Sequence, residues 1–417
     1  MTQLMAPAPP AFERPVHQLR ERGQLLLPSF SHADRVALFH INAQRSGAFT
    51  LTDTPQGARL EAGPYVGVFT LATCTVQVRP KAGIGTGNLL FMLARTMGRQ
   101  WSLPQAPLSL NTSNLQEELA ALFVHRLRTE LQRGLLRRSQ NVQEELPVLR
   151  GRLRVAAYMR QGDRSRLPVE YVDLTANHPA NRLFLLVLER LLSRVSGWVL
   201  RQHVAELRVW LREAGVTPWP ATPHDWSPFT LNRLQRRYDL PLTLARMLLE
   251  GWGAWQDAGP VHGQAFAFNM DRLFEQFLTR VLVEDVLPGT GYVGRAQRPF
   301  HQREYLFQGG VQELLPDLTV LEGGEVRLII DFKNKRLGGA HNGSDLYQMY
   351  SYARHLHCGH VLLIYPDAVN VPTLKAAGLP PLQISAAGID LKPGLPQHLP
   401  DLHEQLRAFL RGQGIHL

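Results

Sequence analysis

The spacing of apolar positions changes twice along the 417-residue chain and divides it into three regions. Up to residue 100, short runs rich in Val, Thr and Phe are separated by Gly and Pro, as linked strands are. From 101 to 260, apolar residues recur at the spacing of amphipathic helices. From 261 to 417, helical and strand-like runs alternate. We therefore expect a multi-domain α/β protein with a β-rich N-terminal domain (1–100), a helical middle region (101–260) and a C-terminal α/β domain (261–417).

Helix starts and stops in the middle region are marked by residue type. Asn114 followed by Glu117 has the pattern of a capped helix start, and a stripe of leucines follows it. A second helix is expected after Pro179, and a third is expected to end at Gly215, since glycine favours helix C-termini. The C-terminal domain is expected to begin with the helix "NMDRLFEQFLTRVLVEDVLPG" (269–289).

One strand of the C-terminal domain carries charged residues at its end. In "LIIDFK" (328–333), the first residues are apolar on both sides, as in an interior strand covered on both faces. Because side chains alternate along a strand, Asp331 and Lys333 share one face and Phe332 points to the other. The pattern predicts that a carboxylate and an ammonium leave the core side by side.

A tight hairpin is expected immediately before that strand. In "VLEGGEV" (320–326), Gly323 and Gly324 tolerate the positive φ that such turns require. The preceding strand begins at Asp317, so the hairpin brings Asp317 near Asp331 and Lys333.

The residue types at this strand end suit phosphodiester chemistry. Two carboxylates, Asp317 and Asp331, with a backbone carbonyl form the all-oxygen site that Mg²⁺ prefers. Lys333 is a compact charge that orients water or stabilises developing negative charge. The alternative is an ordinary edge strand on which Asp331 and Lys333 form a surface ion pair.

The charge balance favours a polyanionic partner. The formal net charge is +10 and the isoelectric point is about 9.9, which suits nucleic acid. The alternative is a diffuse excess that only aids solubility. The chain has 40 arginines and 5 lysines, so the lysines at 333 and 335 stand out.

Other function classes have little support in the sequence. The two cysteines, Cys74 and Cys358, form no Cys-x-x-Cys pair, which argues against a common zinc site and fits a reducing cytoplasm. No run approaches the roughly 20 apolar residues of a membrane helix, so we expect a soluble protein without a membrane partner. The chain has no Walker motif, and any nucleotide-driven step must come from a partner.

The pair "PD" (316–317) and "DFK" (331–333) resembles the PD-(D/E)xK core of restriction endonucleases. More widely, the chain resembles McrC, the nuclease subunit of the modification-dependent McrBC restriction systems. The matching segments follow one another over most of the chain: "YVGVFTLATCTVQVRPKAG" (65–83), "LRGRLRV" (149–155), "YVDLTANHPANRLFLLVLERLL" (171–192), "LFEQFL" (273–278) and "DLYQMYSYA" (345–353). Phe332 and Asn334 depart from the small residue and the tyrosine that often flank the lysine in McrC.

This resemblance implies a role for each site residue. Asp317 and Asp331 would be the Mg²⁺ ligands and Lys333 the catalytic lysine. Glu275 matches the acidic residue often found on the first helix of the nuclease core, although a surface glutamate is an equal reading. Gln348, one turn before Tyr352 on the helix after the lysine strand, would orient the phosphate or the lysine, unless it lies on an ordinary solvated face.

The resemblance also implies partners. An McrC subunit cuts methylated or otherwise modified DNA together with McrB, an AAA+ GTPase ring that it stimulates. Two other readings stay open. One is a stand-alone PD-(D/E)xK nuclease acting on DNA or RNA. The other is a non-catalytic adaptor that regulates a motor ring through residues 1–260.

Overall fold

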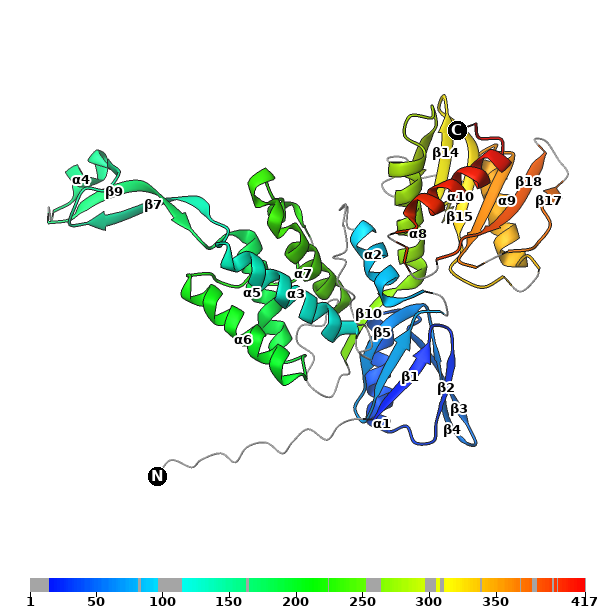
Figure 1. Cartoon of the computed structure of the whole chain (residues 1–417), viewed down its shortest axis with the longest axis horizontal. Helices are drawn as coiled ribbons and strands as arrows, with labels where there is room; N and C mark the ends of the chain where they lie inside the picture. Colours follow the sequence, from blue (N-terminus) through cyan, green and yellow to red (C-terminus); the bar gives the residue numbers. More distant parts are fainter. Residues whose placement is uncertain are drawn as a thin grey trace. The chain divides into compact units, whose positions relative to one another are not determined.

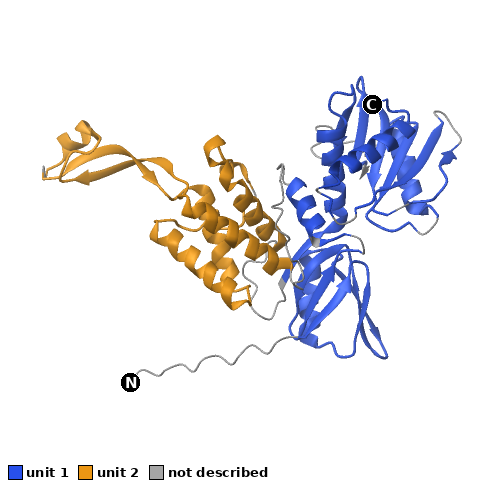
Figure 2. Cartoon of the chain, viewed as in Figure 1, with its two compact units in different colours: residues 1–113, 255–417 blue, residues 114–254 orange. Residues whose placement is uncertain are grey.

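The structure is a computed structural model, and it divides the chain into two compact units (Figure 2). Unit 1 combines residues 1–113 with 255–417, and unit 2 holds residues 114–254. The predicted division into domains at 100 and 260 stays a prediction. No helix in the described part of the chain is long and apolar enough to cross a membrane. The described residues are 15–81, 84–96, 115–162, 165–223, 225–252, 264–296, 305–307, 311–337, 340–367, 369–376, 381–391, 394–395 and 397–416.

Unit 1 begins with two sheets that enclose one apolar core. Its elements are β1 (Val16–Arg20), β2 (Gln24–Leu27), α1 (His32–Gln44), β3 (Phe49–Thr54), β4 (Gly57–Ala62), β5 (Tyr65–Thr70), β6 (Thr75–Arg79) and α2 (Thr86–Thr96). One sheet has the order β2-β4-β3, and the other has β1-β6-β5 followed by a later strand. Residues of α1 and of both sheets are buried in the shared core, among them Ile41, Leu60, Phe69 and Val76. The β-rich character predicted for this region is confirmed.

The later strand is β10 (Gln264–Asn269), which pairs antiparallel with β5 from Gln264 opposite Thr70 to Asn269 opposite Tyr65. We name the N-terminal module as β1–β6, α1, α2 and β10. This strand lies after residue 261, within the range predicted for the C-terminal domain, and it completes the N-terminal sheet. Asn269 then caps α8 (Met270–Val281) through the backbone N–H of Arg272, so the chain passes from the module into the next helix without a linker.

The rest of unit 1 contains a mixed sheet of order β11-β14-β15-β16-β18-β17. Strands β15, β16 and β18 are parallel, whereas β11, β14 and β15 pair antiparallel. Gly323 and Gly324 have φ of +59° and +94°, which confirms the predicted hairpin between β14 and β15. The elements are α8, the π-helix η3 (Leu282–Val286), β11 (Val293–Ala296), β12 (Tyr305–Phe307), β13 (Val311–Glu313), β14 (Leu318–Glu322), β15 (Glu325–Phe332), α9 (Gly343–His355), β16 (His360–Tyr365), β17 (Leu374–Ala376), β18 (Leu382–Gly388) and α10 (Leu399–Gly412).

Helices α8 and α9 pack on this sheet (Figure 1). The ring of Phe274 on α8 lies edge-on to Phe332 of β15, with the centroids 6.4 Å apart. Met349 of α9 shares a buried cluster with Ile329 of β15. Ile329 and Phe332 stand on opposite faces of the strand because side chains alternate. The helices therefore cover opposite faces of β15, which is buried from Leu328 to Phe332.

Unit 2 contains helices and an antiparallel sheet of order β7-β9-β8. The predicted helices after Pro179 and before Gly215 are confirmed as α5 and α6, while Asn114 lies outside the described residues. The elements of the unit are α3 (Leu115–Gln132), β7 (Arg138–Leu146), β8 (Arg152–Leu153), α4 (Val155–Arg160), β9 (Leu167–Thr175), α5 (Pro179–Leu192), α6 (Trp198–Glu213), the 3₁₀ turns η1 (Ser227–Phe229) and η2 (Arg233–Tyr238), and α7 (Asp239–Trp252).

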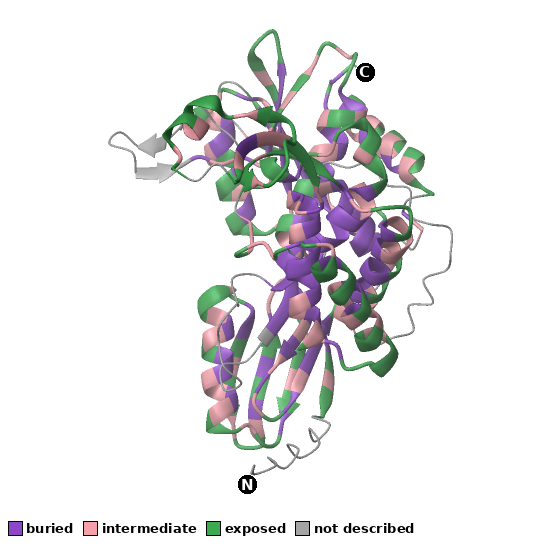
Figure 3. Cartoon of the chain, turned by 90° about the vertical axis from the view of Figure 1, so that its left-hand side faces the viewer, coloured by how far each residue is buried: buried purple, intermediate pink, exposed green. Residues whose placement is uncertain are grey.

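The sheet in unit 2 was not predicted, since the sequence indicated only helices in the middle region. Strand β7 is exposed or half-buried at every position, and Figure 3 shows this part of the chain without the continuous buried stretches of the other sheets. A strand that covers no core needs no alternation of apolar and polar residues, so its sequence lacks that signal. The ribbon of β7 and β9 extends away from the helices of its own unit (Figure 1).

Candidate active site

The three residues of the predicted motif meet where β15 ends. Asp331 is 2% exposed, and the backbone N–H of Lys333 donates to the carbonyl of Ile364, which continues the β15–β16 pairing. The Asp317 carboxylate accepts a hydrogen bond of 2.8 Å from the backbone N–H of Phe332. The hairpin therefore ties Asp317 to the strand end, as the sequence predicted.

The Lys333 ammonium is held by groups from the strand and from α9. Its Nζ lies 2.8 Å from Oδ2 of Asp331 and donates to Oε1 of Gln348 at 3.1 Å. Gln348 in turn donates to the hydroxyl of Tyr352 at 3.0 Å, one helical turn further along α9. Gln348 is exposed, yet its side chain lies at the lysine rather than on a separate solvated face. The role of Gln348 in orienting the lysine or the phosphate stays a prediction.

Acidic side chains are concentrated around the two aspartates. Burial, together with the nearby carboxylates of Asp331 and Glu275, raises the pKa of Asp317 to about 8. Burial also raises the pKa of Asp331, against the opposing effect of Lys333. Burial disfavours the Lys333 ammonium, but the Asp331 carboxylate beside it raises the pKa of Lys333 above its ordinary value. Glu275 acts on Asp317 from α8, so this helix turns an acidic residue towards the site.

This donor set fits a divalent cation. The carboxylates of Asp317 and Asp331 are hard oxygen ligands, and a bound cation would offset both the burial and the neighbouring carboxylates that raise the pKa of Asp317. Among the residues that the structure describes, no three His, Cys, Asp or Glu side chains already form a metal-binding group. Mg²⁺ suits such a sparse site, because it keeps several waters and takes only one or two carboxylates from a protein.

Sequence reasoning missed Asp345, which pairs with the second lysine. Asp345 is 7% exposed in the first turn of α9, and its Oδ2 lies 2.6 Å from Nζ of Lys335. Its other oxygen lies 3.9 Å from Nζ of Lys333. In the sequence, Asp345 follows the N-cap Asn342, where an acidic residue commonly stabilises the helix dipole. Its pairing with Lys335 could therefore not be predicted from its position. Lys335 thus holds the first turn of α9 against the end of β15.

Comparisons with known proteins place the chain in a family. The family described as "McrBC 5-methylcytosine restriction system component" matches residues 60–366. A solved structure from Thermococcus gammatolerans, described as McrB AAA+ hexamers with bound McrC, is 20% identical over 94% of this chain and 100% of that one, with a TM-score of 0.65. A second, of the Thermococcus gammatolerans McrBC complex, is 24% identical over 64% of this chain and 87% of that one, with a TM-score of 0.48. None of the curated proteins matches the sequence.

Proposed function

This chain belongs to the family of McrBC 5-methylcytosine restriction system components, and from that premise we propose that it is the subunit that cuts DNA, by Mg²⁺-dependent hydrolysis of phosphodiester bonds. The observation that carries the proposal is the meeting of Asp317, Asp331 and Lys333 at one strand end. Their arrangement is that expected of a PD-(D/E)xK nuclease core.

Each side chain has a role that follows from its position. Asp317 and Asp331 would hold the cation, and Glu275 adds negative charge beside Asp317. A bound Mg²⁺ supplies Lewis-acid activation of the phosphate and of a water molecule. The Lys333 ammonium stabilises negative charge that develops on the phosphate oxygens. Gln348 accepts a hydrogen bond from Lys333 and limits the directions in which the ammonium points.

The proposal extends to partners. The Thermococcus gammatolerans structure is described as McrB AAA+ hexamers with bound McrC. By the same family relationship, we propose that this chain works with an McrB-like GTPase ring, stimulates its GTP turnover and acts on methylated or otherwise modified DNA. The net charge of +10 supports a nucleic-acid substrate.

The test compares charge-removing variants in a DNA-cutting assay with the ring, GTP and Mg²⁺. Asp331→Asn and Lys333→Met are expected to lower the rate by at least ~10²-fold, because each removes a cation ligand or a stabilising charge. Lys375→Met is the matched control, since Lys375 is an exposed lysine on the short strand β17. Chelation of Mg²⁺ is expected to stop cutting by the wild type.

Two outcomes would contradict this assignment. If Asp331→Asn cut DNA at the wild-type rate, Asp331 would not belong to the active site and the assignment would be wrong. Cutting by the wild-type chain alone, with Mg²⁺ but without ring or GTP, would favour the stand-alone nuclease instead.

A further inference from the structure

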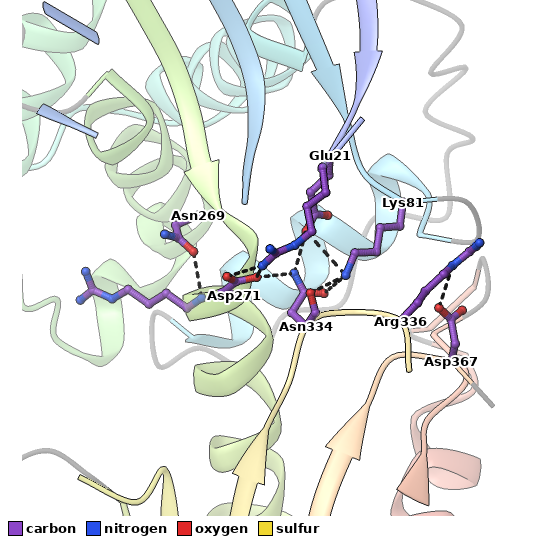
Figure 4. A network of polar contacts seen from close by, with 9 residues as sticks. Glu21, Lys81, Asn269, Asp271, Asn334, Arg336 and Asp367 are labelled. Carbon is purple, nitrogen blue, oxygen red and sulfur yellow. Dashed lines mark hydrogen bonds and ion pairs between the residues drawn. The ribbon is translucent and has the colours of Figure 1, made fainter. Parts of the chain in front are cut away.

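Asn334, the residue after the proposed catalytic lysine, forms hydrogen bonds with side chains of the N-terminal module and of α8 (Figure 4). Asn334 is 3% exposed. Its Nδ2 donates to Oε1 of Glu21 at 2.9 Å and to Oδ1 of Asp271 at 3.0 Å. Its Oδ1 accepts from Nζ of Lys81 at 2.9 Å. Glu21 follows β1 and Lys81 follows β6, so two neighbouring strands of the module meet at one amide.

Lys81 holds the main chain as well as the side chain. Its ammonium also donates to the backbone carbonyl of Asn334. Nζ of Lys81 lies 3.7 Å from Oε1 of Glu21, and the two side chains are 11% and 0% exposed. Arg22 completes the network with a contact of 2.7 Å to Asp271 at the start of α8. The segment that leaves β15 is therefore fixed from the module at a point one residue from Lys333.

Other contacts also attach the module to the rest of unit 1. A second polar contact joins them elsewhere, since Nη2 of Arg95 on α2 lies 2.6 Å from Oδ1 of Asp285 in η3. Apolar packing joins them too, with the rings of Phe91 and Phe277 centred 6.0 Å apart. Burying an acid and an amine in a pair costs desolvation energy that apolar packing avoids. What the Lys81–Glu21–Asn334 network adds is a defined position for the backbone beside Lys333.

We propose that Asn334 is a positioning residue of the nuclease site, and that Lys81 and Glu21 transmit displacements of the N-terminal module to Lys333. The inference rests on the proposed function for its consequence in cutting. Consecutive Cα atoms are about 3.8 Å apart, so a shift of Asn334 moves the Lys333 backbone with it. The module thereby acts as a regulator of the site, and a partner that moves β1 against β15 changes the rate of cutting.

The first test separates position from mere attachment. Lys81→Met and Asn334→Ala are expected to lower kcat by on the order of 10-fold to 10²-fold with little change in KM for DNA, since misplacement of a catalytic group acts on the chemical step. Arg95→Met breaks a different polar contact of the module, the one with Asp285, and is expected to leave kcat near the wild-type value. An equal fall in kcat for Arg95→Met and Lys81→Met would overturn the proposal.

Two substitutions of Glu21 test whether its hydrogen bond to Asn334 is needed for cutting. Glu21→Gln keeps a carbonyl oxygen that accepts from Asn334, whereas Glu21→Ala keeps none. We expect Glu21→Gln to cut near the wild-type rate and Glu21→Ala to cut as slowly as Lys81→Met. Equal rates for these two variants would show that the hydrogen bond to Asn334 does not matter.

Hydrogen exchange gives a readout that is independent of cutting. In Lys81→Met, the amides of residues 333–337 are expected to exchange faster, while those of 361–364 in β16 stay as in the wild type. Unchanged exchange at 333–337 would overturn the coupling, whatever the cutting rate. Faster exchange with no cutting by the wild type under any condition would leave the coupling in place and refute the nuclease assignment.

Discussion

At the scale of single residues, the scarce lysines of this chain cluster around one site. The chain has 5 lysines against 40 arginines, and three of them meet acidic groups there: Lys333 at Asp331, Lys335 at Asp345 and Lys81 at Glu21. The three lysine side chains are 17%, 32% and 11% exposed, so each is largely buried beside its acidic partner. A compact ammonium fits such places, whereas the planar fork of arginine requires a wider acceptor. The residue type thus follows from the space available.

Glu21 gives a pH-dependent prediction at the same scale. Burial raises its pKa from 4.5 to about 7, with Lys81 and Arg22 opposing the rise, Asp271 adding to it and the Asn334 amide opposing it. The folded chain therefore holds this proton more tightly than the unfolded chain. The stability that results is fully present below pH 4.5 and is lost as the pH rises through about 7.

Glu21→Gln removes this titration. Relative to the wild type, its free energy of unfolding is expected to rise between pH 5 and pH 8 by up to about 3 kcal/mol, the equivalent of the shift in pKa. Thermal unfolding of both chains at the two pH values measures the difference. A difference between the two chains that does not change with pH would contradict the assignment of that proton to Glu21.

At the scale of elements, the pairing of β5 with β10 depends on a single glycine. Gly67 lies opposite Ala267 with φ of +151°, and a Cβ there would lie 1.9 Å from the carbonyl oxygen of Phe266. No side chain fits at that distance, so the backbones of these strands approach closely because position 67 is glycine.

Gly67→Ala is therefore expected to destabilise unit 1 more than a substitution that only strains φ. Gly324 is the matched control, because it has φ of +94° and open space where a Cβ would stand. Gly324→Ala is expected to cost about 1–3 kcal/mol from its backbone alone. Gly67→Ala must in addition displace β10, so its melting temperature should fall further. Equal falls for the two variants would mean that the approach of β10 is not tight.

The same scale shows which elements the sequence could predict. The β14–β15 hairpin was predictable because Gly323 and Gly324 have a turn-specific conformation, and β15 was predictable from its apolar run. Strand β7 was not, since no core selects its residues. That β10 belongs to the N-terminal sheet was not predictable either, because its partner β5 lies almost two hundred residues earlier. The sequence of a short apolar strand does not indicate which strand it pairs with.

The residues of the candidate site also divide into those that the sequence could predict and those that it could not. Asp317, Asp331 and Lys333 followed from alternation along a strand and from one turn, which are local rules. Asp345, Glu21 and Lys81 come from other elements, and only the folded chain brings them to Lys335 and Asn334. Long-range polar contacts leave no periodic pattern in a sequence.

At the scale of the whole molecule, unit 2 is one continuous segment, whereas unit 1 is built from both ends of the chain. A fragment of residues 114–254 therefore keeps all of its own core and is expected to unfold cooperatively when expressed alone. Residues 255–417 keep Asp317, Asp331 and Lys333 of the proposed site but lose β5, the partner of β10, and the contacts of Lys81 and Glu21 with Asn334. We expect this fragment to be poorly soluble alone and to become soluble when it is co-expressed with residues 1–113.

Circular dichroism and gel filtration of the three preparations check this expectation. A soluble 255–417 fragment with the thermal transition of the intact chain would show that the module is dispensable for folding. Residues 255–417 would then fold without the β5–β10 pair, contrary to the expectation.

The pairing of β5 with β10 also has a consequence in time. The ribosome finishes β5 at residue 70 and reaches β10 only at residue 264. At roughly 5–20 residues per second, the interval lasts about 10–40 s, which is far longer than a hairpin needs to form. During that interval all of unit 2 is synthesised, while β5 presents an open edge. The N-terminal sheet is therefore begun early in synthesis and closed late, after the inserted unit has had time to fold.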